Sequence, residues 1–408
     1  MVQGYNSQTI FEEGKIMHKL GFGFMRLPVF NPEDMTTVDI EQVKRMADYF
    51  IGSGFTYFDT AYMYHDYTSE SALRQAVVER HARDKFTVAT KMPLALMRSG
   101  DEQESIFSKQ LQNLGVDFID YYLLHNMTYE QYLKAKKWGT IEFLQERQAA
   151  GQIRHLGFSC HDSAENLGKI LAERDCFEFV QLQINYMDWE NPGIQSHACY
   201  ETAKAHGLKV TVMEPVKGGT LAKIPDEAEA VLRAVHPEWS PAEWAIKAAA
   251  SLPEVQVVLS GMSTFEQLKA NVDAMKGFAP MSEAEFDALH KAADIIRNWY
   301  AVPCTACRYC VETNKCPRNI PIPNYFALYN AYKQRSPESM PGGFAIERMY
   351  YADYERDGYG KASSCVKCRK CEKVCPQHLK IADLLKDVAD DMEIDMAAAM
   401  AALHPKKD

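Results

Sequence analysis

The chain has 408 residues, 47% of them hydrophobic and 25% charged, which is ordinary for a globular protein and excludes disordered and fibrous classes. This length allows a large core and predicts more than one domain. The formal net charge of −10 opposes nonspecific binding to nucleic acid or anionic lipid. The sequence has no signal-peptide pattern and no uncharged apolar run long enough for a membrane span, so we expect a cytoplasmic protein.

Residues 20 to about 275 alternate short apolar runs with longer amphipathic segments. Eight apolar runs suit buried strands, at 20–25, 56–59, 86–91, 118–124, 153–159, 179–184, 209–213 and 256–259. Eight segments have a helical pattern, at 40–51, 69–80, 102–114, 141–150, 163–172, 194–205, 241–250 and 265–275. This alternation predicts a parallel α/β sheet, and eight units favour a (β/α)8 TIM barrel over a doubly wound open sheet.

Local signals support several helix ends. Gly115 stands where helix-ending glycines belong, and Ser240 with Pro241 forms a cap followed by proline at the first helical position. A further helix is expected over 282–298, because Ser282 and Glu285 have the spacing of a capping box.

The cysteines are distributed unevenly along the chain. Eight of the eleven lie between residues 304 and 375. They form two runs, Cys304-x2-Cys307-x2-Cys310-x5-Cys316-Pro317 and Cys365-x2-Cys368-x2-Cys371-x3-Cys375-Pro376. A disulfide framework normally comes in a short secreted chain, so these runs indicate metal or cluster ligation in a reducing compartment.

Three thiolates at two-residue intervals suit three corners of a cubane, and the following cysteine lies too far away for the same cluster. The two runs resemble the dicluster module of bacterial ferredoxins, in which that fourth cysteine ligates the other cluster. The resemblance implies two [4Fe–4S] clusters, one held by Cys304, Cys307, Cys310 and Cys375 and the other by Cys365, Cys368, Cys371 and Cys316. Structural zinc is the alternative, but it leaves the third cysteine of each run unused.

Two features depart from that module. The first run has five residues before its last cysteine where the module has three, and 48 residues separate Cys316 from Cys365. The composition changes near residues 298–302, which predicts two domains, a barrel at 1–298 and a smaller, mainly helical ferredoxin-like iron–sulfur domain at 299–408. The second domain is expected to end in a helical tail rich in Met and Ala.

Four residues of the types that a carbonyl reductase needs follow successive predicted strands. Asp59 ends the second strand, Lys91 the third and His125 the fourth, and Tyr64 lies in the loop after Asp59. Active sites of barrels lie at these strand ends. A tyrosine is a poor acid at neutral pH unless a cation such as lysine lowers its pKa, and an aspartate keeps the lysine charged. A neutral histidine can orient the carbonyl.

These four residues and their neighbours, in FDTAYMYH, FTVATK and IDYYLLH, resemble the aldo-keto reductase superfamily. The resemblance covers roughly residues 15 to 276. It implies an NAD(P)H-linked reductase of aldehydes or ketones with Tyr64 as the acid, because the family's spacing from aspartate selects Tyr64 over Tyr62. Each residue alone is more often a turn former, a solvated charge or rim packing, but the combination favours the family.

The same resemblance implies a nicotinamide site. It assigns contacts with the carboxamide to Ser159 and Gln181, and contacts with the nicotinamide ring and pyrophosphate to Met213, Glu214, Pro215, Gly218 and Gly219. Cys160 replaces an asparagine that the family usually has, and Met213 replaces an aromatic stacking residue in many members. Cys160 is more often a packed thiol than a reactive one.

The adenosine side of the nucleotide is implied at four positions, Gly261, Ser263, Gln267 and Asn271. The helix that follows presents an N-terminus suited to phosphate. Members that prefer NADPH often have Lys or Arg here, so both NADH and NADPH remain open, with a lean towards NADPH. Arg26, just past the first strand, is a candidate for attracting a carboxylate of the substrate or for a rim salt bridge.

A hydride carries two electrons, whereas each cluster passes one, and in most enzymes a flavin converts between them. The sequence has no flavin fingerprint, although barrels bind FMN without one. We interpret the chain as an oxidoreductase whose clusters link a carbonyl-reducing barrel to an electron partner of the ferredoxin or flavodoxin type. Two alternatives are cluster-delivered reduction of an unusual substrate in anaerobic metabolism, and a nucleotide-binding redox sensor with little turnover.

Overall fold

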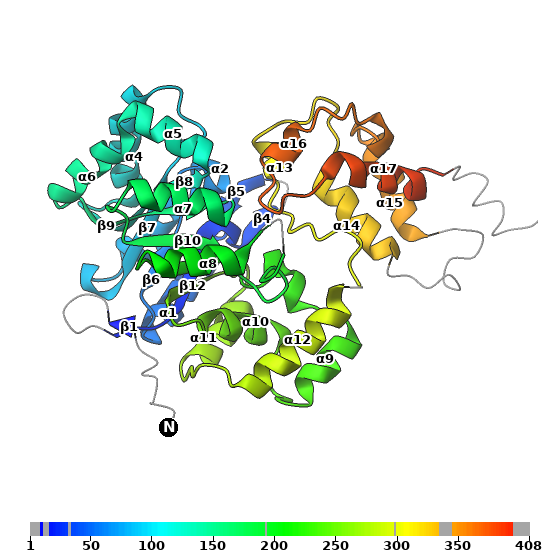
Figure 1. Ribbon diagram of the computed structural model, residues 1–408, viewed down its shortest axis with the longest axis horizontal. Helices are drawn as coiled ribbons and strands as arrows, with labels where there is room; N and C mark the ends of the chain where they lie inside the picture. Colours follow the sequence, from blue (N-terminus) through cyan, green and yellow to red (C-terminus); the bar gives the residue numbers. More distant parts are fainter. Residues whose placement is uncertain are drawn as a thin grey trace, which may run out of the picture. The chain divides into compact units, whose positions relative to one another are not determined.

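The computed structural model describes residues 9–10, 16–31, 34–191, 194–297, 299–333 and 345–394. The chain divides into two compact units, Met1–Lys217 with Arg233–Leu289, and Gly218–Leu232 with His290–Asp408 (Figure 1). The second unit therefore includes a short segment from within the barrel sequence. Within the described ranges, no helix is both long and apolar enough to span a membrane.

The first unit contains a closed barrel of parallel strands in chain order, so the predicted barrel is confirmed. Its strands are β3 (Leu20–Gly23), β6 (Tyr57–Asp59), β7 (Thr87–Met92), β8 (Ile119–Met127), β9 (Ile153–Cys160), β10 (Phe179–Gln183), β11 (Lys209–Met213) and β12 (Val255–Gly261). All eight overlap the predicted runs. Two small antiparallel pairs, β1 (Thr9–Ile10) with β2 (Ile16–Met17) and β4 (Val29–Asn31) with β5 (Asp34–Val38), were not predicted.

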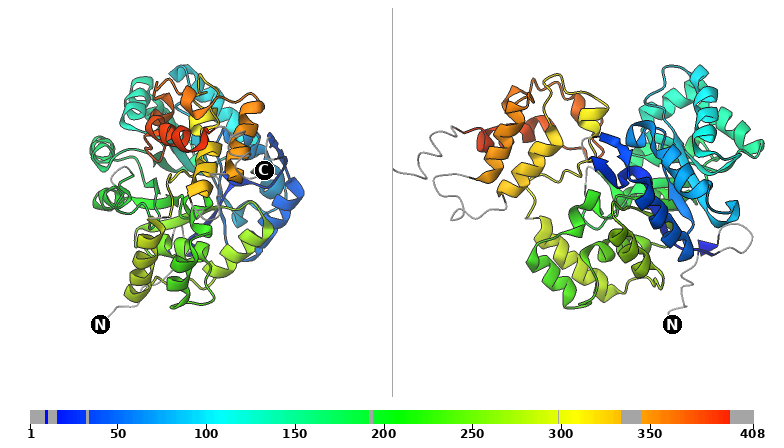
Figure 2. Two further views of the ribbon diagram at one scale, coloured as in Figure 1. Left: turned by 90° about the vertical axis from the view of Figure 1, so that its right-hand side faces the viewer. Right: turned by 180° about the vertical axis from the view of Figure 1, so that it is seen from behind.

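Helices surround the barrel (Figure 2). Those that match the predicted segments are α1 (Ile40–Gly52), α3 (Ser69–Leu73) with the π-helical turn Arg74–Val78, α4 (Gln103–Leu114), α6 (Thr140–Ala149), α7 (Ala164–Glu173), α8 (Ser196–Ala205), α10 (Pro241–Ala250) and α11 (Phe265–Met275). The short helix α2 (Tyr64–Tyr67) and the longer α5 (Tyr129–Trp138) and α9 (Asp226–Arg233) were not predicted. Both longer helices are rich in charged residues, which weakens the apolar pattern on which the prediction relied.

The predicted helix ends are present. Gly115 ends α4 with a φ of 69°, where a side chain would be strained. Ser240 accepts a hydrogen bond from the backbone N–H of Glu243 at 3.1 Å and so caps α10. The backbone N–H of Ser282 donates to Glu285 Oε2 at 2.5 Å and the backbone N–H of Glu285 donates to Ser282 Oγ at 3.4 Å, which forms the expected capping box at the start of α12 (Glu283–Arg297).

The strands present alternate side chains to the barrel interior, and this alternation positions the site. Tyr57, Ala89 and Leu123 belong to one buried cluster that is separate from the core under the helices. Because side chains repeat every two residues along a strand, the inward face continues from these to Asp59, Lys91 and His125 at the carboxyl ends. The three predicted catalytic residues on strands therefore share the mouth of the barrel.

The second unit is mainly helical, as predicted. Its helices are α13 (Tyr309–Glu312), α14 (Ile322–Lys333), α15 (Ile346–Arg356), α16 (Lys370–Lys373) and α17 (Ile381–Met392), and it also includes all but the last residue of α9 and the last part of α12. Its core is a separate cluster centred on residues such as Tyr325, Phe326, Tyr351 and Leu385. The part of the Met- and Ala-rich tail that follows residue 394 lies outside the described residues.

Candidate functional site

A buried ion pair lies at the mouth of the barrel. The Nζ atom of Lys91, whose side chain is fully buried, donates to Oδ1 of Asp59 at 2.7 Å and to the backbone carbonyl of Thr60 at 2.6 Å. β6 and β7 are neighbours in the barrel, which brings the two side chains together from positions 32 residues apart. A pair this buried keeps its geometry, because neither charged group can exchange its partner for hydrogen bonds to water.

Tyr64 and His125 complete the group. Their rings lie edge to face with centroids 5.8 Å apart, and Lys91 Nζ lies 5.1 Å from the centroid of the Tyr64 ring. Tyr64 is half-buried, whereas His125 is buried. The structure thus brings all four predicted catalytic residues to one place, with the hydroxyl-bearing side chain being the most exposed.

Burial sets the electrostatics of this group. It lowers the pKa of Lys91, and the nearby Asp59 carboxylate opposes that shift. Burial also raises the pKa of Asp59, opposed by the Lys91 ammonium. The pKa of His125 is well below its usual 6.5, first because of burial and then because of the Lys91 charge. His125 is therefore neutral at neutral pH and has one N–H to donate.

The loop after Tyr64 is strained and anchored by a histidine that the sequence analysis missed. His65, Asp66 and Tyr67 have φ values of 51°, 49° and 68°, a region that non-glycine residues rarely adopt. The buried His65 ring holds this conformation, because its Nε2 accepts from the backbone N–H of Leu27 at 3.1 Å and its Nδ1 lies 2.9 Å from the carbonyl oxygen of Met35. His65 thereby fixes where Tyr64 stands.

Three predicted nicotinamide contacts lie on adjacent strands. Ser159 on β9 pairs in register with Gln181 on β10, and Gln181 Nε2 lies 3.4 Å from the sulfur of Met213 at the end of β11. The Ser159 hydroxyl accepts from the backbone N–H of Asn126 at 2.9 Å. β9 pairs with β8, which carries the predicted catalytic residue His125.

Buried acceptors at this edge of the barrel fit a carboxamide. Oε1 of Gln181 and Oδ1 of Asn126 are buried and have no hydrogen-bond partner within the described part of the chain. Buried acceptors without a donor are costly, and an amide group supplies such donors. Asn126, which the sequence analysis did not select, lies with a φ of 53° where β8 loses its register with β9. Cys160 is buried and its pKa is raised by burial, as expected of a packed thiol.

The predicted adenosine positions lie after β12. The backbone N–H of Ser263 donates to Gln267 Oε1 at 2.8 Å, and its hydroxyl donates to the backbone carbonyl of Arg26 at 2.8 Å. Asn271 is buried on α11 and donates to Ser260 Oγ at 3.1 Å. The side chain of Arg26 packs on Gly261, where a Cβ atom would lie 3.3 Å from it. Arg26 therefore lies at this nucleotide edge, beside the exposed Ser263.

The predicted pyrophosphate segment divides between the two units. Met213, Glu214 and Pro215 belong to the first unit, whereas Gly218 and Gly219 belong to the second. Gly218 has a φ of 64°, and a side chain there would collide with the backbone carbonyl of Thr305, next to the first cysteine of the first run. Lys217 is the last residue of the first unit before this division. It is buried, and its Nζ lies 2.6 Å from Asp188 Oδ1.

A small pocket in the second unit brings the first cysteine run together with Cys375. It is lined by four cysteines, Cys304, Cys307, Cys310 and Cys375, and by apolar side chains that include Ile322, Phe326, Leu379 and Ile381. The four cysteines are the first set that the ferredoxin resemblance implied. Across the described ranges, no three His, Cys, Asp or Glu side chains converge to hold a single metal ion. The four thiols that line one pocket suit a group that is bound by thiolates.

Backbone contacts hold the last cysteine of the first run beside the second run. The side-chain amide of Asn314, on the segment leading to Cys316, donates to the backbone carbonyl of Lys370. On the other side of Cys316, the backbone N–H of Gly360 donates to the carbonyl of Asn319 at 3.1 Å. These contacts join the segments on either side of Cys316 to Lys370 in the second run and to Gly360, five residues before Cys365.

The two runs share one backbone pattern. Positive φ values occur at the second and fourth residues after each first cysteine, which are Ala306 and Arg308 in one run and Lys367 and Arg369 in the other. They recur at the third residue after each last cysteine, Asn319 and His378. A short helix follows within each run, and α14 and α17 begin six residues after each last cysteine. Strained non-glycine residues at matching positions indicate two loops shaped for the same kind of group.

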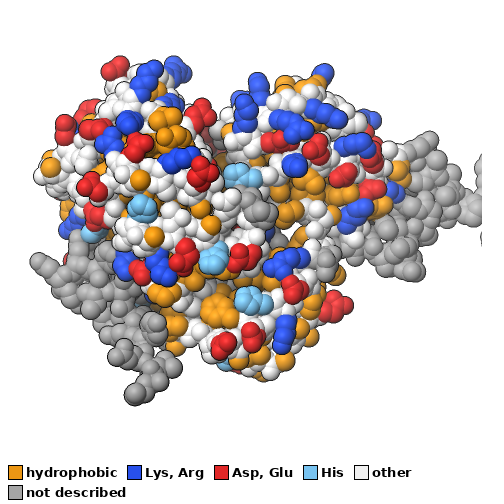
Figure 3. Space-filling model, in the orientation of Figure 1, with side chains coloured by type: hydrophobic (Ala, Val, Ile, Leu, Met, Phe, Trp, Pro, Cys, Tyr) orange, Lys and Arg blue, Asp and Glu red, His pale blue; other side chains and the backbone are white. Residues whose placement is uncertain are grey.

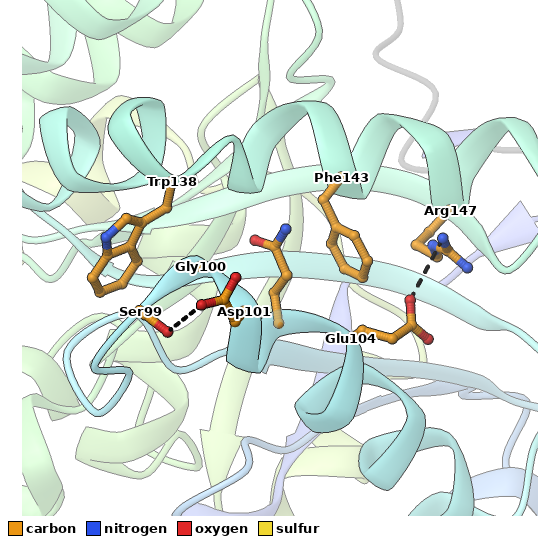
Figure 4. Close-up of a pocket in the computed structure, with 8 residues that line it drawn as sticks. Ser99, Gly100, Asp101, Glu104, Trp138, Phe143 and Arg147 are labelled. Carbon is orange, nitrogen blue, oxygen red and sulfur yellow. Dashed lines mark hydrogen bonds and ion pairs between the residues drawn. The ribbon is translucent and has the colours of Figure 1, made fainter.

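A separate surface pocket contains none of the predicted site residues. It is formed between the start of α4 and the helices α5 and α6, and it is lined by Ser99, Gly100, Asp101, Gln103, Glu104, Trp138, Phe143 and Arg147 (Figure 4). Arg147 and Glu104 approach to 3.5 Å across it. The Ser99 hydroxyl donates to Asp101 Oδ2 at 3.3 Å in the same pocket. Since none of the predicted site residues lines it, the candidate site is the mouth of the barrel.

Comparison with known families agrees with this geometry. The model of the aldo/keto reductase family matches residues 19–294, and that of the 4Fe-4S dicluster domain matches residues 303–380. The chain is 25% identical over 279 residues to an uncharacterized oxidoreductase of Bacillus subtilis, covering 60% of this chain and 86% of that protein. It is 24% identical over 221 residues to a 9,11-endoperoxide prostaglandin H2 reductase of Trypanosoma cruzi, covering 54% of this chain and 69% of that protein.

Solved structures give the same fold. The holo form of an aldo-keto reductase from Bacillus halodurans has a TM-score of 0.56 and 23% identity, covering 69% of this chain and 94% of that one. An aldo-keto reductase from Klebsiella pneumoniae in complex with NADPH has a TM-score of 0.55 and 19% identity, covering 71% of this chain and 94% of that one. The shared part is the barrel.

Proposed function

Because the chain belongs to the aldo/keto reductase family and carries a 4Fe-4S dicluster domain, we propose that it reduces an aldehyde or ketone with NADPH or NADH and exchanges electrons with a redox partner through its clusters. The observation that carries the proposal is the buried Lys91–Asp59 pair placed beneath the Tyr64 ring. We propose no nucleic-acid partner, because the net charge of the chain is negative. We propose a cytoplasmic location, because free thiolates require a reducing compartment.

The chain's own residues hold the cofactor and substrate. Gln181 and Asn126 bind the carboxamide, because their buried side-chain oxygens have no donor within the described part of the chain. Ser159, which accepts from the backbone N–H of Asn126, binds it beside them. When bound, the nicotinamide supplies a hydride to the carbonyl carbon. The segment Met213–Pro215 covers the ring, and Ser263, Gln267 and Asn271 bind the adenosine side. NADPH is favoured over NADH because Arg26, which packs on Gly261, can bind the 2′-phosphate. The loop after β12 has no Lys or Arg of its own.

Tyr64 donates its hydroxyl proton to the carbonyl oxygen as the carbonyl carbon receives the hydride. Lys91 stabilises the tyrosinate that remains, and Asp59 holds Lys91 in place. His125 is neutral, so it donates a hydrogen bond to the same oxygen and does not compete as an acid. One carbonyl, one NAD(P)H and one proton thus give one alcohol and one NAD(P)+.

The iron–sulfur ligands follow from the two neighbourhoods described above. Cys304, Cys307, Cys310 and Cys375 line one pocket, which supports a cluster there. Cys365, Cys368, Cys371 and Cys316 form the other set. Within the second unit, Gly218 lies against Thr305, which is next to Cys304 of the first run.

The reaction is tested by aldehyde-dependent oxidation of NADPH with the holoprotein under anaerobic conditions. A panel of aromatic and aliphatic aldehydes is supplied, and absorbance at the reduced-nicotinamide band is followed while the alcohol is quantified by chromatography. We expect one alcohol per NADPH consumed. The absence of any alcohol across the panel, in protein with intact clusters, would contradict carbonyl reduction as the activity.

A further inference from the structure

The second cysteine run lies in a basic stretch of an acidic chain. Residues 358–380 contain six Lys and Arg residues against one acid, Glu372, whereas the whole chain has a formal charge of −10. The first run is nearly balanced, since residues 303–316 contain Arg308, Lys315 and Glu312 as their charged residues. The positive charge is therefore concentrated around one of the two implied clusters.

That stretch is also exposed. Residues 366–370, which include Cys368, are all exposed, and Val366 is 50% exposed. In the first run, by contrast, Cys310 is buried. Figure 3 shows Lys and Arg side chains gathered over the part of the second unit that carries α16. The second run thus has an exposed sulfur and an apolar side chain within a basic surface.

The charges of this surface are largely available to a partner. Arg369 approaches Glu372 and Asp383 at 3.4 and 3.5 Å. Within the described part of the chain, Lys367, Lys370 and Lys373 have no ion pair. These lysines are not explained by a need to neutralise the charge of the cluster. A [4Fe–4S]2+ core with four thiolates carries about −2 in either run, yet the first run has no such surplus of basic residues.

We infer that this basic face, defined as Lys367, Arg369, Lys370 and Lys373 around Cys368, is the docking surface for a small acidic electron-carrier protein. The inference rests on the proposed function and names its redox partner. Complementary charge steers such a carrier to the surface and raises its association rate, and Val366 supplies an apolar contact at the centre. The small contact area expected of redox encounters lets the carrier leave after each transfer.

The step is a one-electron exchange. A reduced carrier loses one electron and the cluster held by Cys365, Cys368, Cys371 and Cys316 gains it, without a bond being made or a proton being moved. The exposed sulfur of Cys368 shortens the distance between the two redox groups. The cluster on Cys304, Cys307, Cys310 and Cys375, of which Cys310 is buried, then exchanges electrons within the protein.

The test uses the anaerobic holoprotein and a reduced plant-type [2Fe–2S] ferredoxin, which is small and acidic, as the probe. Stopped-flow absorbance measures the second-order rate of cluster reduction at several ionic strengths. We expect the wild-type rate to fall as salt rises. The variant Lys367→Glu/Lys370→Glu/Lys373→Glu should lose at least about tenfold of the low-salt rate and most of its salt dependence.

Two controls separate docking from other effects. The matched variant Lys109→Glu/Lys137→Glu/Lys204→Glu makes the same change in net charge on exposed barrel lysines and should keep the wild-type rate. EPR redox titration must give equal cluster content and potentials in both triple variants, so that slower transfer reflects docking. Equal rates and salt slopes in the wild type and the basic-face variant would overturn the docking surface.

The same proteins distinguish this inference from the proposed function. Aldehyde reduction with NADPH is assayed without ferredoxin, and the basic-face variant should keep it. Retained aldehyde reduction together with unchanged ferredoxin kinetics would refute the docking surface alone. If the wild-type protein did not reduce aldehydes at all, the proposed reaction would be refuted, while the ferredoxin kinetics would still report on docking.

Discussion

Replacing Tyr64 with phenylalanine should lower kcat for aldehyde reduction by about 10²–10⁴-fold, the usual contribution of a positioned proton donor. The substitution removes the hydroxyl and keeps the ring, so the edge-to-face contact with His125 and the position above Lys91 should remain. Steady-state kinetics measure kcat, and fluorescence titration measures the Kd for NADPH. The Kd should stay close to the wild-type value, because the missing hydroxyl serves the substrate carbonyl.

The matched control is Tyr62→Phe. Tyr62 lies two residues earlier, packs against Tyr67 with ring centroids 5.3 Å apart, and is not part of the Lys91 group. It should keep most of the activity, which separates the loss of a proton donor from a disturbance of the strained loop. Comparable losses in the two variants would argue against Tyr64 as the acid.

Cys375→Ala should remove the cluster whose other three ligands lie about 65 to 71 residues earlier in the chain and spare its own sequence neighbours. The pocket places Cys375 with Cys304, Cys307 and Cys310. Iron content should fall from about eight to about four atoms per chain, and one of two EPR signals should disappear. The remaining signal should then be lost in a second variant, Cys375→Ala/Cys368→Ala.

Cys176→Ala serves as the matched control, because this half-buried free cysteine lies in the barrel sequence, outside both runs. It should retain both clusters. If Cys375→Ala abolished the same EPR signal that Cys368→Ala alone abolishes, each cluster would instead take its four ligands from one run, and the exchanged ligand sets would be wrong.

The sequence predicted the barrel well because its determinants are local. Each apolar run is short, is bounded by polar residues, and lies where a strand is observed, so the ends at Asp59, Lys91 and Met213 follow directly. Parallel strands in a closed barrel must present these ends at one mouth, which is why four residues far apart in sequence form one group. Tyr64 was selected by its spacing from Asp59.

Other features depend on contacts that no local pattern encodes. Asn126 lies where β8 changes register with β9, between Leu124 and Met127, and register changes carry little sequence signal. The division of the segment after β11 depends on Thr305, nearly 90 residues away from Gly218 in the chain. The anchoring of His65 likewise depends on backbone groups of Leu27 and Met35 on another segment.

The two halves of the chain differ in how they handle electrons, and this difference defines the central claim. The barrel moves electrons in pairs with a hydride, whereas the clusters take them singly. Coupling therefore requires a group that accepts the pair from one nicotinamide as a hydride and passes the electrons on singly, as a flavin does in most enzymes. Two clusters in one chain provide the matching number of acceptors.

The most direct measurement is an anaerobic titration of the holoprotein with NADPH, followed by optical and EPR spectra, after iron and sulfide have been quantified. The account predicts that about one equivalent of NADPH reduces both clusters, since two electrons fill two one-electron acceptors. Clusters that stay oxidised in excess NADPH, in protein that still reduces aldehydes, would contradict the coupling of the barrel to the clusters.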